Sequence, residues 1–162
     1  MTEPFLYETE VKPAWIDYNG HMNVAYYVLA FDHAIDDFYG RLGLGEAYAR
    51  SGRGSMFALT LKVDYLREVR AGDPLRITTL MLDCDAKRIH YCQEMVQAAA
   101  GYVAARKEGL SIHVDLGTRR SAPFPPDRMA AVRACLEAHA ALPRPEWVGQ
   151  RIGIRRRSGG ET

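Results

Sequence analysis

The sequence has little of several features that mark particular classes of protein. It contains only three cysteines in 162 residues, Cys84, Cys92 and Cys135, and no two of them have C-x-x-C spacing. An odd number of cysteines in a chain of this length argues against a disulfide framework or a zinc ribbon. We therefore expect reduced thiols, a cytoplasmic protein, and neither a metal site nor a cofactor.

The chain also lacks a dominant charge and a long apolar run. Its 21 basic and 20 acidic residues leave a formal net charge of +1, so no global field attracts nucleic acid or an anionic membrane. No apolar stretch approaches bilayer length, and residues 1–10 carry three glutamates where a secretory signal would need an apolar core. Arg151, Arg155, Arg156 and Arg157 form a local basic group, which is typical of a frayed tail but also suits phosphate binding.

The clearest pattern that is present predicts an amphipathic helix. Asn23 precedes it as an N-cap, because its side-chain oxygen can accept an unpaired backbone N–H. Gly43 and Gly45 end it, and residues 46–50 can add one short turn. The apolar positions follow the i, i+3, i+4, i+7 spacing of one helical face: Val24, Tyr27, Val28, Phe31, Ala34, Ile35, Phe38 and Leu42.

Beyond residue 54 the apolar period changes from that of a helix to that of a strand. Turns such as Gly72-Asp73-Pro74 separate the strands, and short connections of this kind make neighbouring strands antiparallel. Pro123, Pro125 and Pro126 break the sheet before a second helix over 127–141. The pattern predicts strands over 57–69, 75–83, 89–98 and 102–116, the last kinked at Gly109, after a first strand over 5–11.

This order of elements predicts an α+β fold. A single domain over 1–142 would pack the long helix on a curved antiparallel sheet of about five strands, with a C-terminal helix. Residues 143–162 show no convincing element and would form a flexible tail. Free strand edges favour association, so we expect a homo-oligomer, a dimer or a tetramer.

One segment has the residue types of a catalytic site. Asp17, Asn19 and His21 lie two apart, so in an extended loop their side chains point to one side. A carboxylate can act as nucleophile or activate water, and His21 can share the proton transfers. Backbone N–H groups near Met22 and Asn23, at the start of the helix, can stabilise an oxyanion.

The same residues also have a purely structural interpretation. Asp and Asn commonly cap helices, and Asn19-Gly20 is a common turn sequence. Spacing alone therefore leaves a capped turn and a catalytic loop both open.

The run from Trp15 to Tyr27, WIDYNGHMNVAYY, resembles hot-dog thioesterases of the 4-hydroxybenzoyl-CoA thioesterase-like superfamily. In particular it is similar to the D-x-N-x-H-x-N-x-x-x-Y segment of acyl-acyl-carrier-protein thioesterases. The resemblance implies that Asp17, Asn19 and His21 are catalytic and that the reaction is hydrolysis of an acyl-CoA thioester to free acid and CoA. Those carrier-protein enzymes contain two hot-dog units, so this chain, with one, would have to dimerise.

The chain also resembles the betainyl-CoA thioesterases of bacterial carnitine breakdown, through overall similarity around residues 11–45. Aromatic residues crowd the same region; most would be core, and some can form a box for a quaternary ammonium group. CoA phosphates need basic partners, for which Arg119-Arg120 is the first choice and Arg53, Arg88, Arg106 and Lys107 are further candidates. The predicted substrate-binding residues are Trp15, Tyr18, Met22, Asn23, Tyr26, Tyr27, Phe57, Tyr65, Arg119 and Arg120.

Two other functions fit the same fold. A non-catalytic acyl-CoA-binding sensor or accessory module would bind the ligand tightly without turnover. A hydratase would use an Asp–His pair in a different motif, which the sequence lacks. A serine nucleophile motif, a phosphate-binding loop and a dinucleotide fingerprint are also missing.

Overall fold

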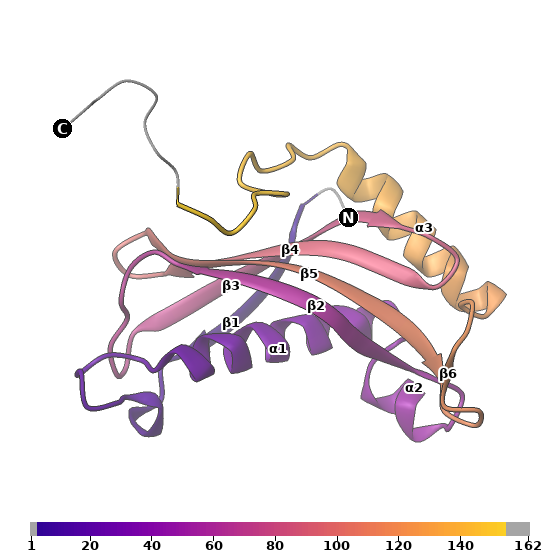
Figure 1. Cartoon of the computed structure of the whole chain (residues 1–162), viewed down its shortest axis with the longest axis horizontal. Helices are drawn as coiled ribbons and strands as arrows, with labels where there is room; N and C mark the ends of the chain where they lie inside the picture. The colour runs from indigo at the N-terminus through magenta and orange to yellow at the C-terminus, as the bar shows by residue number, and fades with distance from the viewer. Residues whose placement is uncertain (1–2, 155–162) are drawn as a thin grey trace.

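The computed structural model describes residues 3–154, in which an antiparallel sheet curls around one long helix (Figure 1). The predicted α+β arrangement is confirmed. The elements in chain order are β1 (Phe5–Glu10), η1 (Pro13–Trp15), α1 (Val24–Arg41), α2 (Glu46–Arg50), β2 (Ser55–Tyr65), β3 (Pro74–Cys84), β4 (Arg88–Gln97), β5 (Tyr102–Asp115), β6 (Arg120–Ser121) and α3 (Pro126–Ala140).

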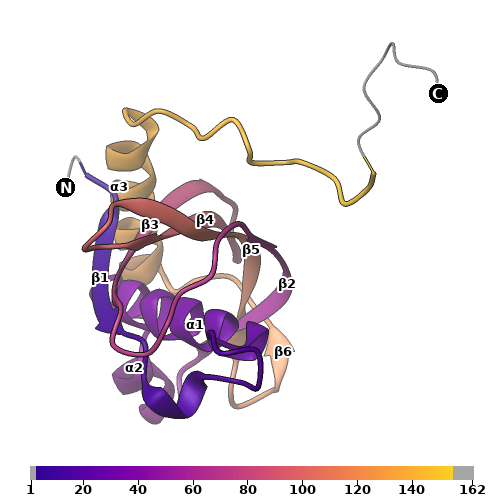
Figure 2. The same ribbon diagram turned by 90° about the vertical axis from the view of Figure 1, so that its left-hand side faces the viewer.

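Helix α1 begins where its apolar period predicts, and most of the predicted apolar face is buried, but Val24 at its first position is 55% exposed. Asn23 caps it, with its side-chain oxygen accepting a hydrogen bond from the Ala25 N–H at 3.0 Å. Phe31 and Ala34 are fully buried against the sheet, and Phe38 extends the same face toward the other end. Figure 2 shows the sheet curving around this helix, so that α1 occupies the inner, concave face.

The order of the strands differs from a simple series of hairpins. The sheet runs β1-β3-β4-β5-β2, so β2 and β3 are not neighbours although they follow each other in the chain. The expectation that the Gly72-Asp73-Pro74 turn joins two paired strands was therefore wrong. Residues 66–73 instead carry the chain from one edge of the sheet to the other side of β4, because β2 pairs with β5 and β3 pairs with β1 and β4.

Strand β2 also ends four residues before the expected boundary. Leu66 and Arg67 both donate backbone hydrogen bonds to the carbonyl of Ala104, at 2.9 and 3.1 Å, which turns the chain out of the sheet. The predicted kink at Gly109 is absent, since Gly109 pairs regularly with Leu61 and Tyr91. A Cβ at Gly109 would lie 2.5 Å from the ring of Tyr91, so glycine permits close packing there.

Helix α3 lies beside β3, beyond the point where β1 begins. Nδ1 of His139 accepts a hydrogen bond from the buried backbone N–H of Met81 at 2.9 Å. Burial lowers the pKa of His139, which favours the neutral ring that can accept this bond. The helix therefore covers an otherwise open strand edge.

The C-terminal segment lies on the outer face of the sheet, the face turned away from α1 (Figure 1). Residues 142–154 contain no helix or strand, as expected, but they make specific contacts. The Gly149 N–H donates to Glu108 at 2.7 Å, and the guanidinium of Arg106 stands 5.4 Å from the Trp147 ring. Arg155, Arg156 and Arg157 lie outside the described residues.

None of the helices within residues 3–154 is long and apolar enough to cross a membrane.

Candidate active site

The loop before α1 is a closed turn held by backbone bonds. Ile16 and Met22 form an isolated antiparallel bridge, and the Asp17 N–H donates to the His21 carbonyl at 3.2 Å. The Gly20 N–H donates back to the Asp17 carbonyl at 3.0 Å, with Gly20 at φ +80°. Only glycine adopts that angle without strain, so the turn depends on Gly20.

The carboxylate of Asp17 is fixed in one orientation by two donors. Its Oδ1 accepts a hydrogen bond from the Asn19 backbone N–H at 2.8 Å, and its Oδ2 accepts one from Asn23 Nδ2 at 3.0 Å. The same Asn23 side chain caps α1 through its oxygen. Asn23 was predicted as the helix cap and as a substrate-binding residue, but its hydrogen bond to Asp17 was not predicted. The carboxylate is thereby held by a half-buried amide that is itself anchored to the helix.

The three predicted catalytic side chains lie in one turn but do not bond to one another. Asn19 is exposed and contributes its backbone N–H to Asp17. His21 is half-buried, with Nδ1 3.2 Å from the Met22 carbonyl oxygen. Among the described residues no hydrogen bond joins the side chains of Asp17 and His21, so the structure holds Asp17 more firmly than it holds His21.

The predicted oxyanion donors are occupied. The Met22 N–H donates to the Val69 carbonyl and the Asn23 N–H to the Trp15 carbonyl, both at 2.9 Å. The prediction that the Met22 N–H is free was wrong because Val69, which follows β2, lies beside the loop. Its carbonyl accepts the hydrogen bond of the Met22 N–H. The Val24 N–H remains as a candidate, since the first residue of a helix has no carbonyl partner within that helix.

The predicted aromatic residues divide into core and rim. Trp15 is buried and stacks on Tyr26 at 5.7 Å, and Met22 is fully buried. Tyr27 is buried and meets Tyr65 edge to face at 5.3 Å.

Tyr65 is 47% exposed and its hydroxyl donates to the Val24 carbonyl at 3.4 Å, so it borders the start of α1. Tyr18 is 97% exposed at the tip of the turn, and Phe57 lies on the exposed edge strand. The structure thus brings Tyr27 and Tyr65, but neither Tyr18 nor Phe57, against the start of the helix.

The structure does not bring Arg119 and Arg120 to the Asp17 loop of the same chain. Arg119 lies in the β5–β6 turn, where its guanidinium is 5.8 Å from the Phe57 ring, and Arg120 begins β6. Phe57 and Tyr65 are eight residues apart along β2, which corresponds to about 26 Å of strand. Within one chain the two arginines are therefore at the wrong end of β2 for this site.

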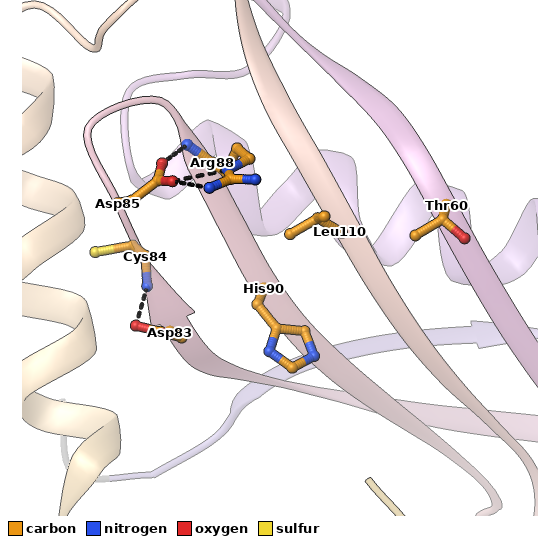
Figure 3. A pocket seen from close by; sticks show the side chains of 7 residues that line it. All are labelled: Thr60, Asp83, Cys84, Asp85, Arg88, His90 and Leu110. Carbon is orange, nitrogen blue, oxygen red and sulfur yellow. Dashed lines mark hydrogen bonds and ion pairs between the residues drawn. The ribbon is translucent and has the colours of Figure 1, made fainter. Parts of the chain in front are cut away.

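The remaining basic candidates have local partners. Arg53 pairs with Asp127 at 3.3 Å and Arg106 with Glu94 at 3.0 Å. Arg88 binds Asp85 across the β3–β4 turn and lines a cavity of about 370 Å³ on the outer face (Figure 3). None of the predicted catalytic residues lines that cavity.

Lys107 differs from these residues because it is buried on the inner face. Its Nζ lies 5.9 Å from the Phe31 ring and 5.3 Å from the Tyr91 ring. Burial lowers the pKa of Lys107 to about 8, although Asp32 and Asp36 oppose the shift. Its position in the core, 2% exposed, is unsuited to a phosphate at a site mouth.

The donors that converge here are not those of a metal centre. Within residues 3–154 no group of three His, Cys, Asp or Glu side chains is arranged to hold a metal ion. What the loop offers is an oriented carboxylate, a neighbouring imidazole and a helix N-terminus, which are the groups needed for water attack on an activated carbonyl.

A curled antiparallel sheet wrapped around a long helix is the hot-dog fold of thioesterases. Residues 11–132 match the family model described as the thioesterase-like superfamily. The chain belongs to this superfamily and is a thioester hydrolase.

Two curated relatives and one solved structure are similar over most of the chain. The Betainyl-CoA thioesterase of Pseudomonas aeruginosa is 39% identical, over 91% of this chain and 93% of the relative. The L-carnitine dehydrogenase/betainyl-CoA thioesterase of Rhizobium meliloti is 34% identical over 93% of this chain, which spans 30% of that longer relative. A Staphylococcus aureus protein solved in complex with CoA is 27% identical and superposes with a TM-score of 0.86, over 96% of this chain and 98% of that one.

Proposed function

We propose that the thioester cleaved by this hydrolase is an acyl-CoA, specifically betainyl-CoA, and that Asp17 activates the attacking water. The observation that carries the proposal is the carboxylate of Asp17, held by two hydrogen bonds at the start of α1. A base fixed in this way needs no reorganisation when it receives a proton. His21, in the same turn, serves the second proton transfer.

The reaction balances with these groups alone. Asp17 takes a proton from water as the water oxygen bonds to the thioester carbonyl carbon. The carbonyl oxygen becomes an oxyanion next to the Val24 N–H at the positive end of α1. The carbon–sulfur bond then breaks, and His21 gives a proton to the leaving CoA sulfur. The proton held by Asp17 returns to His21 through solvent, which restores both groups and leaves the free acid and CoA.

Two observations support betaine as the acyl group. The first is the similarity to the Pseudomonas aeruginosa protein over nearly its whole length. The second is the edge-to-face pair of Tyr27 and Tyr65 beside Val24. Aromatic faces attract a quaternary ammonium through their quadrupole, so the pair suits the trimethylammonium end of a betainyl thioester.

The proposed site is completed in a homodimer. Among the described residues β2 pairs only with β5, so its other edge is open, and the strand carries exposed apolar side chains, among them Leu59 and Leu61. Antiparallel pairing of two β2 edges about a twofold axis would bury these side chains. It would also place Arg119, which stands over Phe57 at the start of β2, at the partner's Tyr65 end. In this arrangement Arg119 and Arg120 meet the CoA diphosphate in the partner's site.

We place the reaction in the cytoplasm. Cys84, Cys92 and Cys135 are all free, and two of them are buried. Burial raises the pKa of Cys92 to about 12, so this thiol stays protonated and unreactive. Unpaired thiols are typical of a reducing compartment.

The decisive experiment measures CoA release with a thiol reagent. The substrates are betainyl-CoA, its uncharged isostere 3,3-dimethylbutanoyl-CoA, and short, medium and aromatic acyl-CoAs. We expect betainyl-CoA to give the highest kcat/KM, and Asp17→Asn to lower kcat by a factor of about 10²–10⁴. If the protein hydrolyses neutral acyl-CoAs but not betainyl-CoA, the acyl assignment is refuted. If Asp17→Asn is as fast as wild type, the site assignment is refuted.

A further inference from the structure

A second hollow lies on the outer face of the sheet, beneath the C-terminal segment. It has a volume of about 510 Å³ and lies between the end of β2 and residues 147–153. Cavities of a few hundred cubic ångströms hold small molecules of nucleotide size. None of the predicted catalytic residues lines this hollow, so the mechanism above leaves it without a role.

The lining of the hollow carries a surplus of positive charge. The described lining contains three basic residues, Lys62, Arg106 and Arg151, and one acidic residue, Asp64. Asp64 binds Lys62 through both oxygens, at 2.6 and 2.8 Å, and Arg106 is held by Glu94 from outside the hollow. Arg151 is exposed and takes part in no ion pair within residues 3–154. Arg151 is thus the lining cation without an ion pair in the described part of the chain, and the net positive charge of the lining favours an anion.

A flat aromatic ring borders the same space. Trp147 lines the hollow and is steadied by Arg106, whose guanidinium stands 5.4 Å from the ring centre. The segment is anchored two residues further on, where the Gly149 N–H donates to Glu108. The other oxygen of Glu108 binds His90 at 2.8 Å, so the anchor is itself fixed to β4. An aromatic ring beside several cations is the combination that binds a nucleobase with its phosphates.

The hollow adjoins the proposed active site around the end of β2. Tyr65 lines the hollow and its hydroxyl donates to the Val24 carbonyl at the start of α1. Leu66, the next lining residue, lies where the chain leaves the sheet toward Val69, which holds the Asp17 loop through Met22. A long ligand can thus have one end at Asp17 and the other in the hollow, passing over Tyr65.

We propose that this hollow binds the 3′-phosphorylated adenosine end of CoA, with the adenine on Trp147 and the 3′-phosphate between Arg151 and Lys62. The inference rests on the proposed function, since it names where the substrate's nucleotide lies. It assigns the diphosphate and the 3′-phosphate to different places, the former to Arg119 and Arg120 of the partner chain. The C-terminal segment then acts as part of the substrate site.

The test measures binding by calorimetry on the full chain with three probes: CoA, 3′-dephospho-CoA and adenosine 3′,5′-bisphosphate. We expect wild type to bind the bisphosphate, and Arg151→Ser to weaken CoA binding about tenfold, the usual loss for one charge-assisted contact. The same substitution should hardly change binding of 3′-dephospho-CoA, which lacks the group that Arg151 contacts. Trp147→Ala should weaken binding of all three probes.

Arg144→Ser is the matched control, because Arg144 lies in the same segment but lines a neighbouring hollow. In steady-state assays Arg151→Ser should raise KM for the acyl-CoA and leave kcat unchanged. The proposal is overturned if wild type does not bind the bisphosphate, or if Arg151→Ser and Arg144→Ser have the same KM. Because Asp17→Asn should lower kcat without changing CoA affinity, a failure of the catalytic assignment is separable from a failure of this one.

Discussion

Asn23 links two parts of the molecule through opposite ends of one amide: its Nδ2 donates to Asp17 Oδ2 and its Oδ1 accepts the Ala25 N–H, both at 3.0 Å. The rigid end of α1 is thereby connected to the carboxylate that we propose as the base. Orientation of a catalytic group by a neighbour that is itself fixed is a general requirement for an efficient site. One side chain thus caps the helix and orients the carboxylate of Asp17.

This double role predicts different defects for two substitutions of Asn23. Asn23→Ala removes both bonds, so we expect a loss of about 1 kcal/mol of stability, the usual cost of a lost cap, together with a lower kcat. Asn23→Asp keeps a capping oxygen but places a second carboxylate against Asp17. It should keep most of the stability and still lose activity. Thermal unfolding and CoA-release assays on both variants check this; equal kcat in wild type and Asn23→Asp would contradict the positioning role.

Tyr65 is expected to determine selectivity for the charged acyl group. Tyr65→Leu removes the aromatic face, so kcat/KM for betainyl-CoA should fall by a factor of about 2–30 relative to 3,3-dimethylbutanoyl-CoA, which corresponds to a cation–π contact of about 0.5–2 kcal/mol. Tyr65→Phe keeps the ring and loses only the hydroxyl contact with Val24, so it should retain the selectivity. The ratio of the two kcat/KM values in each variant is the measurement, and an unchanged ratio in Tyr65→Leu would exclude this ring from the acyl site.

Lys107 is expected to destabilise the fold at neutral pH. Burial lowers its pKa from 10.5 to about 8, a difference worth about 3 kcal/mol at 1.36 kcal/mol per unit. Because the pKa is lower in the folded chain, the unfolded chain binds more protons between pH 8 and 10.5. The contribution of Lys107 to the free energy of unfolding therefore rises with pH in that window, and the full penalty is present below pH 8.

The variant Lys107→Met, which keeps a similar volume, should thus be more stable than wild type at pH 7, and its advantage should shrink by pH 9.5. Tyr91 does not obscure this comparison, since burial raises its pKa to about 12. Urea unfolding at the two pH values measures the difference. Lys62→Met, at an ion-paired position on the outer face, is the control and should give no such gain. If Lys107→Met is less stable than wild type at pH 7, other interactions of the amine in the folded chain outweigh the cost of burying it.

The sequence predicts those features of the site that depend on neighbours along the chain, and it fails for those that depend on distant segments. The helix, its Asn23 cap and the Asp17–His21 turn all follow from spacings of a few residues. The strand order does not, because pairing β2 with β5 rather than β3 is decided by contacts some fifty residues apart. The occupied Met22 N–H was missed for the same reason, since its acceptor Val69 is reached only after β2. No local pattern in the sequence predicted that Trp147 and Arg151 lie over the end of β2.

The dimeric arrangement predicts that two inactive variants restore each other. Asp17→Asn lacks the base, and the double variant Arg119→Ser/Arg120→Ser lacks the proposed diphosphate contacts. If each site takes Asp17 from one chain and the arginines from its partner, a mixed dimer has one site with both defects and one intact site. Random mixing makes about half of the dimers mixed, so about a quarter of wild-type activity should return at subsaturating substrate. Mixing after mild denaturation and refolding, with each variant refolded alone as the control, measures this recovery. If the arginines serve the site of their own chain, every site in the mixture carries one defect and activity stays at the level of the separate variants, which would exclude the shared site.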